Sequence, residues 1–203
     1  MTERGRFITV EGIDGAGKTT HLPVLKASVE RAGHIAWMTR EPGGTALGEA
    51  LRALVLTEPM APITEALLMF AARGEHYRRE IAPRLARGEW IVCDRFSDAT
   101  YAYQGGGHGV AMHDIAALER MTLDAARPDL TIVFDVPVAV GRARLADGRV
   151  LDRFERERSD FFERVRSAYL ERARAEPSRF RVIDATRAPP IVASELESLV
   201  AAL

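Results

Sequence analysis

Apolar residues in this chain gather in five short, unbroken runs, which are separated by longer stretches of mixed polarity. The runs are rich in isoleucine and valine. Continuous apolar runs of this length are typical of strands that are buried on both faces of a parallel sheet. The predicted strands are FITVE (7–11), HIAWMTR (34–40), WIVCD (90–94), DLTIVFDV (129–136) and RFRVIDA (179–185).

Helical patterns occupy the stretches between these strands. The predicted helices span residues 18–32, 46–57, 62–87, 112–125, 137–146, 158–175 and 189–202. Alternating strands and helices predict an α/β fold in which helices cover both faces of a five-stranded parallel sheet. The segment ADGRVLDRFERER (146–158) has no apolar stripe, and its charge density predicts an exposed, mobile loop.

Length and composition narrow the class of protein. The chain has 203 residues, which suits one domain covering residues 1–203. Its net charge of −1 gives no basic field that would favour nucleic acid as a partner. The start MTERGRF lacks the apolar stretch of a signal peptide, and no run is long enough to span a membrane. Because Cys93 is the only cysteine, no internal disulfide can form, and we expect a soluble protein of the reducing cytoplasm.

The first motif with a clear chemistry is EGIDGAGKTT at residues 11–20. Gly12, Gly17, Lys18 and Thr19 fit the phosphate-binding pattern G-x-x-x-x-G-K-[ST], directly after a predicted strand and at the start of a predicted helix. Glycines allow backbone N–H groups to surround a phosphate, and the helix points its positive end at the same anion. We expect the loop and the residues after it to bind ATP, namely Gly12, Ile13, Asp14, Gly15, Ala16, Gly17, Lys18, Thr19 and Thr20.

A phosphate-binding loop does not decide what is done with the nucleotide. A GTPase-like switch would need an Asn-Lys-x-Asp motif, and this chain contains no asparagine. ATPase motors and transporter engines usually carry a further acidic residue after a buried aspartate, whereas here FDVP (134–137) has a proline. A catalytically silent nucleotide-binding protein remains open.

A second candidate site follows the predicted strand at 90–94. Asp94 and Arg95 stand where that strand ends, and ligands of open α/β sheets bind at this edge. Arg95 is suited to clamp a second phosphate through two parallel hydrogen bonds. Asp94 would orient Arg95 or hold the waters of Mg²⁺, with the Thr19 hydroxyl as the other metal contact. An exposed pair that caps the next helix is the plainer interpretation.

Arginines are dense between residues 142 and 158, and we interpret this segment as a lid. Mobile arginines that close over a transferred phosphoryl group stabilise its charge and exclude water. Several of them could instead form a solvated helix face. A phosphate-binding loop, a second phosphate clamp and a lid together predict a nucleoside monophosphate kinase. The lid arginines are Arg142, Arg144, Arg149, Arg153, Arg156 and Arg158.

Over residues 6–186 the chain resembles the bacterial thymidylate kinase family. The most specific matches are TREPGGT (39–45) and AYQGGG (102–107), supported by LLMFAARGEH (67–76) and RPDLTIVFDV (127–136). The resemblance implies a Mg²⁺-dependent homodimer that transfers the γ-phosphoryl group of ATP to dTMP. A kinase for another nucleoside monophosphate is the alternative.

The resemblance also implies roles for single residues. Lys18 and Arg95 would be catalytic, together with Asp94 and the lid residues Arg149 and Arg153. Arg187 would lie on the adenine side of ATP. The dTMP site would consist of Asp14, Glu41, Pro42, Arg52, Met69, Phe70, Arg73, Arg95, Thr100, Tyr103 and Gln104.

Within that site, Asp14 would accept the 3′-hydroxyl, and Glu41 and Pro42 would shape a turn beside the acceptor phosphate. Tyr103 would lie near the 2′ carbon of the sugar.

Two departures from the family pattern matter. The family places an aromatic residue four positions before Arg73 to stack on thymine, whereas this chain has Met69 there and Phe70 one position later. Either side chain could pack on the base. The lid differs by about one residue around Arg149, so the sequence does not identify the arginine that contacts the transferred phosphoryl group. The sequence also does not identify the surface that forms the dimer.

Overall fold

The computed structural model describes residues 3–124, 126–145 and 152–203. Its centre is one parallel sheet with the strand order β2-β3-β1-β4-β5. The five predicted strands are confirmed, with small shifts at their ends. Their bounds are β1 Phe7–Glu11, β2 Ala36–Arg40, β3 Trp90–Asp94, β4 Leu130–Asp135 and β5 Phe180–Asp184.

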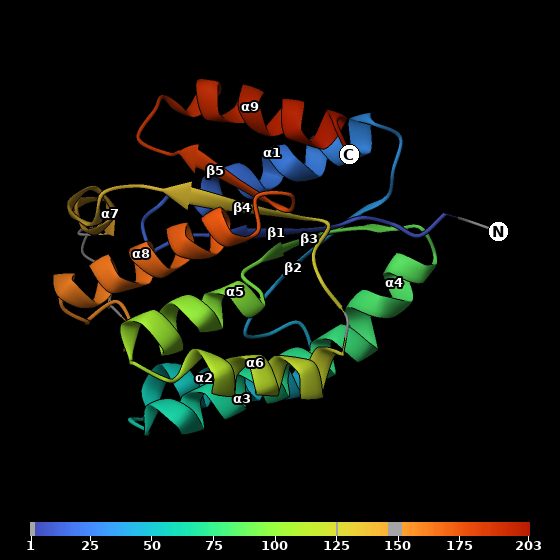
Figure 1. The fold of residues 1–203 in the computed structure, drawn as a ribbon. Coiled ribbons are helices and arrows are strands. Elements are labelled where there is room, and N and C mark those ends of the chain that lie inside the picture. Colours follow the sequence, from blue (N-terminus) through green and yellow to red (C-terminus); the bar gives the residue numbers. More distant parts are fainter. Residues whose placement is uncertain (1–2, 125, 146–151) are drawn as a thin grey trace.

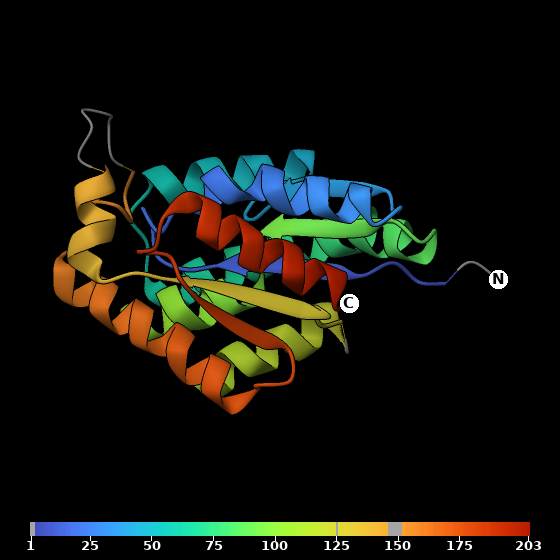
Figure 2. The same ribbon diagram turned by 90° about the horizontal axis from the view of Figure 1, so that it is seen from above.

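Helices cover both faces of this sheet, as expected. In Figure 1, α1 and α9 lie above the sheet, whereas α2, α3, α5, α6 and α8 lie below it. Figure 2 shows α1 and α9 lying across the sheet side by side. The helices are α1 Lys18–Arg31, α2 Ala46–Thr57, α3 Pro62–His76, α4 Ala82–Ala86, α5 Ser97–Thr100, α6 Met112–Leu123, α7 Val138–Leu145, α8 Ser159–Ala175 and α9 Pro189–Ala201.

The strands form the middle of the core. Every residue of β1 is buried, whereas the edge strands β2 and β5 are partly exposed. One core cluster joins the sheet to α1, α8 and α9, and a second packs around Phe7, Phe96 and Ile115 on the side of α3 and α6. Because β1 lies at the centre, the loop that follows it opens in the middle of the sheet's carboxyl edge.

The helix predicted over 62–87 is interrupted. A π-helical turn, η1 (Tyr77–Ile81), separates α3 from α4, and Pro83 lies in the first turn of α4. Proline has no N–H to donate and crowds the preceding turn, so a wider turn before it relieves the clash.

The sequence patterns did not indicate the helical segment over residues 97–107. Here α5 continues into a second π-helical turn, η2 (Tyr101–Gly107). The glycines of η2 permit a close approach to α8: a Cβ on Gly106 would lie 2.7 Å from Cβ of Ala168, and one on Gly107 would lie 2.3 Å from the ring of Phe161. The glycine run is therefore a packing surface.

The exposed loop expected over 146–158 is only partly described, since residues 146–151 lie outside the described ranges. In the described part the prediction is wrong for two positions. Phe154 and Glu155 are 7% and 8% exposed, and Phe154 belongs to the main core cluster. The ring of Phe154 packs edge-on against Tyr103 at 5.7 Å between centroids, which the charge pattern around it conceals.

Candidate active site

The phosphate-binding loop connects β1 to α1 at the carboxyl edge of the sheet. Gly15 and Gly17 have φ angles of 77° and 93°, a region that favours glycine. A Cβ on Gly15 would also lie 2.1 Å from the carbonyl oxygen of Gly141 in α7. The first turn of α1 contains no acidic residue, so its positive end is free to attract an anion.

Lys18 is the first residue of α1, and its side chain folds back over the loop. Its Nζ donates to the carbonyl oxygens of Gly12 and Ile13, at 2.9 and 3.0 Å. Burial and the nearby charge of Arg95 lower the pKa of Lys18 to about 8, although Asp14 opposes this. A bound polyphosphate would place negative charge next to the ammonium group of Lys18 and so favour its charged form.

A cavity of about 650 Å³ opens over this loop, and we call it the loop cavity. The expected residues Asp14, Gly15, Gly17, Lys18, Thr19 and Thr20 line it. Ile13 and Ala16 are buried behind the loop instead. The remaining lining residues are Arg40, Glu41, Arg52, Asp94, Arg95, Arg144, Leu145, Asp152 and Glu155.

Arg95 follows β3 directly, and its φ of 70° turns the side chain back toward the phosphate-binding loop. Nη2 donates to Oδ1 of Asp14 at 2.6 Å and to the hydroxyl of Tyr103 at 3.0 Å. Nη1 donates to the carbonyl oxygen of Gly12 at 3.0 Å and to the hydroxyl of Tyr169 at 3.2 Å. Four contacts therefore hold this guanidinium in one place.

Asp94 does not orient Arg95 through a hydrogen bond within the described residues, so one of its two expected roles is unsupported. Its Oδ1 is buried, and no described residue donates to it. A buried carboxylate oxygen without a partner is costly, and a ligand would satisfy it. Asp94 and Thr19 both line the loop cavity, and such oxygen donors suit Mg²⁺, which keeps several waters and also binds phosphate oxygens. The residues therefore fit the ion.

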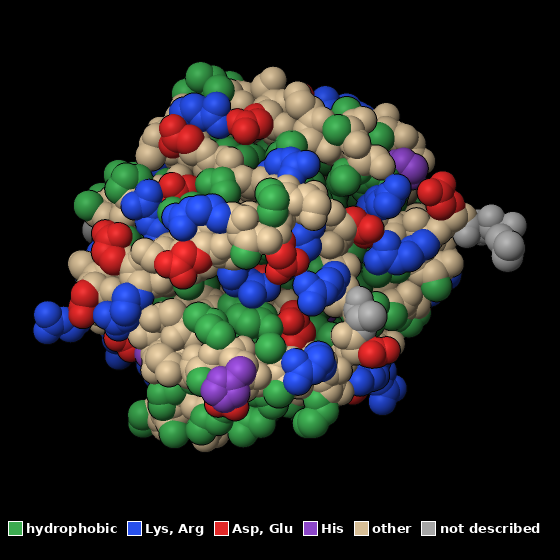
Figure 3. Space-filling view, viewed as in Figure 1, with side chains coloured by type: hydrophobic (Ala, Val, Ile, Leu, Met, Phe, Trp, Pro, Cys, Tyr) green, Lys and Arg blue, Asp and Glu red, His purple; other side chains and the backbone are tan. Residues whose placement is uncertain are grey.

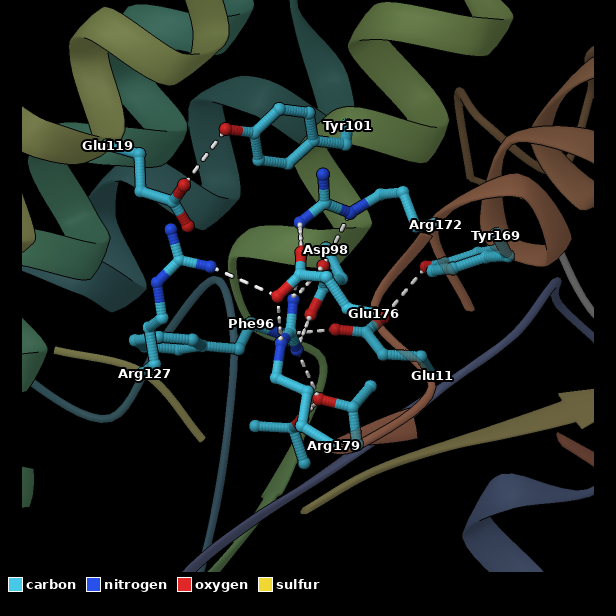
Figure 4. Close-up of polar contacts among 12 residues, drawn as sticks. Glu11, Phe96, Asp98, Tyr101, Glu119, Arg127, Tyr169, Arg172, Glu176 and Arg179 are labelled. Carbon is cyan, nitrogen blue, oxygen red and sulfur yellow. Dashed lines mark hydrogen bonds and ion pairs between the residues drawn. The ribbon is translucent and has the colours of Figure 1, made fainter. Parts of the chain in front are cut away.

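A buried polar network that includes Glu11 and Tyr169 lies next to Arg95, and Figure 4 shows the contact between these two residues. Glu11, the last residue of β1, accepts from the backbone N–H of Phe96 at 2.7 Å and from the hydroxyl of Tyr169 at 2.8 Å. Burial, together with the charge of Asp98, raises the pKa of Glu11 to about 7. Because Tyr169 also contacts Arg95, Glu11 braces the arginine indirectly, through Tyr169 and through the backbone of the next residue.

Asp98 anchors the same region to the rest of the fold. Its fully buried carboxylate pairs with Arg172 of α8 at 2.6 Å and with Arg179, next to β5, at 2.8 Å (Figure 4). These two ion pairs tie α5 to segments that are distant in the sequence.

A second cavity, the inner cavity, adjoins the loop cavity below the sheet. Most of the predicted acceptor residues line it, together with Leu56, Ala99, Asp152 and Phe154. The predicted residues found there are Asp14, Glu41, Pro42, Arg52, Met69, Arg73, Arg95, Thr100, Tyr103 and Gln104.

Arg73 lines the inner cavity, although its side chain is almost fully buried. Nε donates to Glu41 at 2.6 Å, Nη1 donates to Thr100 at 3.0 Å, and Nη2 donates to the carbonyl oxygen of Phe96 at 3.0 Å. A guanidinium has five N–H donors, so two remain for a ligand. Arg52 also lines the inner cavity and donates to the carbonyl oxygen of Pro42 at 3.0 Å.

The structure separates the two candidates for stacking on the base. Met69 lines the inner cavity, whereas Phe70 does not. The ring of Phe70 lies in the second core cluster, 4.8 Å from the guanidinium carbon of Arg73. Phe70 therefore supports Arg73 from the core, and its predicted position in the cavity is not what the structure shows.

The lid arginines divide into different environments. Arg144 lines the loop cavity and donates to the carbonyl oxygens of Gly15 and Ala185, at 3.4 and 3.1 Å. Arg153 lines neither cavity: it donates to the carbonyl oxygen of Val55 and pairs with Glu65. Arg149 lies outside the described residues.

Arg187 also lies apart from both cavities. It donates to the carbonyl oxygen of Asp184 and pairs with Glu195 of α9.

Sequence patterns missed several residues that build the site. Glu11, Glu65 and Tyr169 carry no motif of their own, and each acts through a partner far away in the chain. A carboxylate at the end of an apolar strand was the one available signal for Glu11. Arg144 was noted as one lid arginine among six, and nothing in the sequence singled it out.

Comparison with known proteins decides the family. The thymidylate kinase family profile matches residues 10–196. The chain belongs to the thymidylate kinase family. It is 57% identical over 198 residues to a thymidylate kinase of Bordetella pertussis, covering 98% of this chain and 95% of that protein. It is 56% identical over 187 residues to one of Nitrosomonas europaea, covering 91% and 87%.

A crystal structure supports the same assignment. The thymidylate kinase of Ehrlichia chaffeensis superposes with a TM-score of 0.79 at 32% identity, covering 97% of this chain and 99% of that one. Membership of the thymidylate kinase family agrees with the predicted fold and with the parallel sheet described above. Within the described ranges, no helix has both the length and the apolar character needed to cross a membrane.

Proposed function

We propose that this chain transfers the γ-phosphoryl group of ATP to dTMP, giving ADP and dTDP, with Mg²⁺ as cofactor. The observation that carries the proposal is the junction of the two cavities. Asp14, Glu41, Arg52, Arg95 and Asp152 line both of them. A donor bound in the loop cavity and an acceptor bound in the inner cavity would therefore meet at Arg95, which is the arrangement that direct transfer requires.

The donor side would hold the β- and γ-phosphates of ATP. Lys18 would leave the carbonyl oxygens that it now contacts and bind these phosphates, and the N-terminus of α1 would add its dipole. Thr19 and Asp94 would hold Mg²⁺, which supplies charge neutralisation to the phosphate oxygens when bound. The place of adenine beside Arg187 stays a prediction.

The acceptor side would bind dTMP with its phosphate on Arg95 and its base deep in the inner cavity. Asp14 would accept the 3′-hydroxyl, and the ring of Tyr103 would lie against the 2′ carbon. Arg73 and Arg52 would donate to the carbonyl oxygen at position 4 of thymine. Thr100 and Gln104 would complete the polar contacts, and Met69 would pack on the ring.

The lid would complete the charge stabilisation. Arg144 is the described lid arginine that already lines the loop cavity, so it is the nearest candidate to contact the transferred group. For Arg153 to take part, its ion pair with Glu65 would first have to break. Arg149 keeps the role that its position in the lid predicts.

ADP release tests the proposal. The purified chain is mixed with ATP, Mg²⁺ and dTMP, and ADP is followed by a coupled assay, with Lys18→Met as the matched control. We expect turnover in the parent, and much slower turnover in the control and with other nucleoside monophosphates. Tight ATP binding without ADP release would favour the silent nucleotide-binding protein instead. Faster turnover with another monophosphate would replace dTMP as the acceptor.

We also propose that the chain works as a homodimer in the cytoplasm. Four apolar side chains of α2 and α3 are between 44% and 49% exposed, namely Leu47, Leu54, Ile63 and Leu67. Figure 3 shows apolar side chains gathered over that end of the molecule. Ile81, by contrast, is fully buried. Sedimentation should give twice the mass of the chain, and Leu67→Glu should give the monomer; a monomeric parent would contradict the dimer.

A further inference from the structure

Glu65 is a fully buried carboxylate beside the inner cavity, although it does not line that cavity. It lies in the first turn of α3 and collects donors from two other segments. Oε1 accepts from Nε2 of Gln104 at 2.6 Å and contacts Nδ1 of His108 at 3.1 Å. Oε2 pairs with Arg153. The carboxylate therefore connects α3, η2 and the lid segment at one point.

The charge of Glu65 is well compensated. Burial alone would raise the pKa of Glu65, but hydrogen bonds from His108, Gln104 and Arg153 outweigh it and lower that pKa. An ionised carboxylate accepts hydrogen bonds and cannot donate them. The –NH₂ end of the Gln104 carboxamide must therefore face Glu65.

This orientation fixes what Gln104 offers to a ligand. Gln104 is 1% exposed and lines the inner cavity. Within the described part of the chain, its carboxamide oxygen receives no hydrogen bond. With the nitrogen held by Glu65, the atom left for a base is an acceptor.

We propose that Glu65 is a specificity-determining residue, which holds the Gln104 carboxamide so that the cavity accepts a pyrimidine with an N–H at position 3 and rejects one whose N3 is bare. This inference rests on the proposed binding of dTMP in the inner cavity. Thymine and uracil carry that N–H and can donate to the Gln104 oxygen. The bare N3 of cytosine is an acceptor and would face the carboxamide oxygen of Gln104, which is also an acceptor. Neither atom would then have a hydrogen-bond donor.

The test compares dTMP with 5-methyl-dCMP, because these nucleotides differ only at positions 3 and 4 of the ring. Arg73 also discriminates at position 4, but its contribution is the same in the parent and in the variants below. Any change in the ratio of kcat/KM between these two nucleotides therefore reports on how the site recognises ring position 3 of the base.

Glu65→Gln is the informative variant, since a glutamine at this position can accept or donate and so allows the Gln104 carboxamide to rotate. We expect kcat/KM for dTMP to fall and kcat/KM for 5-methyl-dCMP to rise, so that selectivity narrows about tenfold or more. A residue that only stabilised the fold would lower both values together. Such a parallel fall would overturn the inference.

His108→Phe is the matched control. It removes a different donor from Glu65 but keeps a ring against Phe154 and Phe161, and it leaves the contact between Glu65 and Gln104 intact. The selectivity of this variant should equal that of the parent. A selectivity loss as large as that of Glu65→Gln would contradict a role that acts through Gln104.

Gln104→Met completes a double-mutant cycle and does not depend on the folding of Glu65→Gln. Gln104→Met alone should narrow the selectivity, and adding Glu65→Gln should narrow it little further. Unchanged selectivity in Gln104→Met would overturn the inference on its own. Failure of the proposed function would look different, because the parent itself would not turn over dTMP.

Discussion

Nη2 of Arg95 lies 2.6 Å from Oδ1 of Asp14, so an ion pair joins the arginine that follows β3 to the carboxylate inside the phosphate-binding loop. Tyr103 contacts both partners through its hydroxyl, at 3.0 Å from Nη2 of Arg95 and 2.8 Å from Oδ2 of Asp14. The charge of Arg95 and that of Lys18 lower the pKa of Asp14, against the effect of its burial. These contacts and those to Gly12 and Tyr169 use all four Nη hydrogens of Arg95, so a phosphate bound through two parallel hydrogen bonds would have to replace at least one of them.

Arg95→Lys tests whether Arg95 binds the acceptor phosphate. Lysine keeps the positive charge but cannot form two parallel hydrogen bonds with a phosphate. We expect kcat/KM for dTMP to fall at least a hundredfold, which corresponds to about 3 kcal/mol, while the affinity for ATP changes little. Titrations of ATP and dTMP binding measure the two separately, with Arg181→Lys on the exposed side of β5 as the control. If the affinities for ATP and dTMP fell equally, Arg95 would not be the residue that binds the acceptor phosphate.

Lys18 predicts a pH dependence of ATP binding. Its pKa of about 8 in the free protein means that the ammonium loses its proton above pH 8, well below the ordinary value of 10.5. Because the charged form binds phosphate, the affinity should hold below pH 8 and then fall by up to tenfold for each pH unit above it. Calorimetry with a non-hydrolysable ATP analogue between pH 7 and 10 measures this. Lys18→Met should bind weakly with no such step; a flat profile in the parent would disprove the assignment.

The hydroxyl group and the ring of Tyr103 should make separable contributions, the first to activity and the second to sugar preference. Tyr103→Phe removes the hydroxyl contacts to Asp14 and Arg95 but keeps the ring, so activity should fall while sugar preference is preserved. Tyr103→Ala also removes the apolar wall against the 2′ carbon. An unpaired buried hydroxyl costs about 1–3 kcal/mol, so this variant should narrow the preference for dTMP over ribothymidine monophosphate by about ten- to a hundredfold. The measurement is kcat/KM for both acceptors; an unchanged ratio in Tyr103→Ala would place sugar selection elsewhere.

Glu11 predicts a pH dependence of stability. Its pKa is raised from 4.5 to about 7 in the folded state, so the folded chain binds its proton more tightly than the unfolded chain. The stability from this group is present below pH 4.5 and is lost as the pH rises through about 7. Glu11→Gln cannot ionise. The free energy of unfolding of this variant should therefore rise by about 3 kcal/mol relative to the parent between pH 4 and pH 8.

Urea unfolding at those two pH values measures the difference. Glu163→Gln, an exposed position of α8, serves as the control and should show the same difference from the parent at both. A Glu11→Gln variant that behaves like this control would mean that the pKa of Glu11 is not raised in the folded chain.

Sequence patterns predicted the elements whose structure is determined by their own consecutive residues. The strands β1 and β3 were predicted to the residue, because a short, unbroken apolar run rich in isoleucine and valine favours a buried strand. The turn η2 was missed because a run of three glycines has little tendency to form a helix by itself. Its helical form depends on contact with α8, about 60 residues later.

The residues of the site also divide into those that belong to one contiguous motif and those that only the fold brings together. The phosphate-binding loop is contiguous, so its residues could be named from one motif. The brace of Arg95 by Glu11 and Tyr169 joins residues 158 positions apart, and only the folded chain reveals it. Met69 could not be separated from Phe70 by spacing, since both lie on the buried side of α3.

The lowered pKa of Lys18 has a practical consequence for chemical labelling. Acylating reagents attack neutral primary amines, and the side chains of this chain offer only two, at Lys18 and Lys26. Lys26 is half exposed and pairs with Glu30 on the outer face of α1, away from both cavities. Lys18 lines the loop cavity with a lowered pKa, so it should be acylated at a mildly alkaline pH unless a nucleotide covers it. The ratio of label on these two peptides would report nucleotide occupancy by mass spectrometry, with Lys26 as the internal standard and no engineered probe.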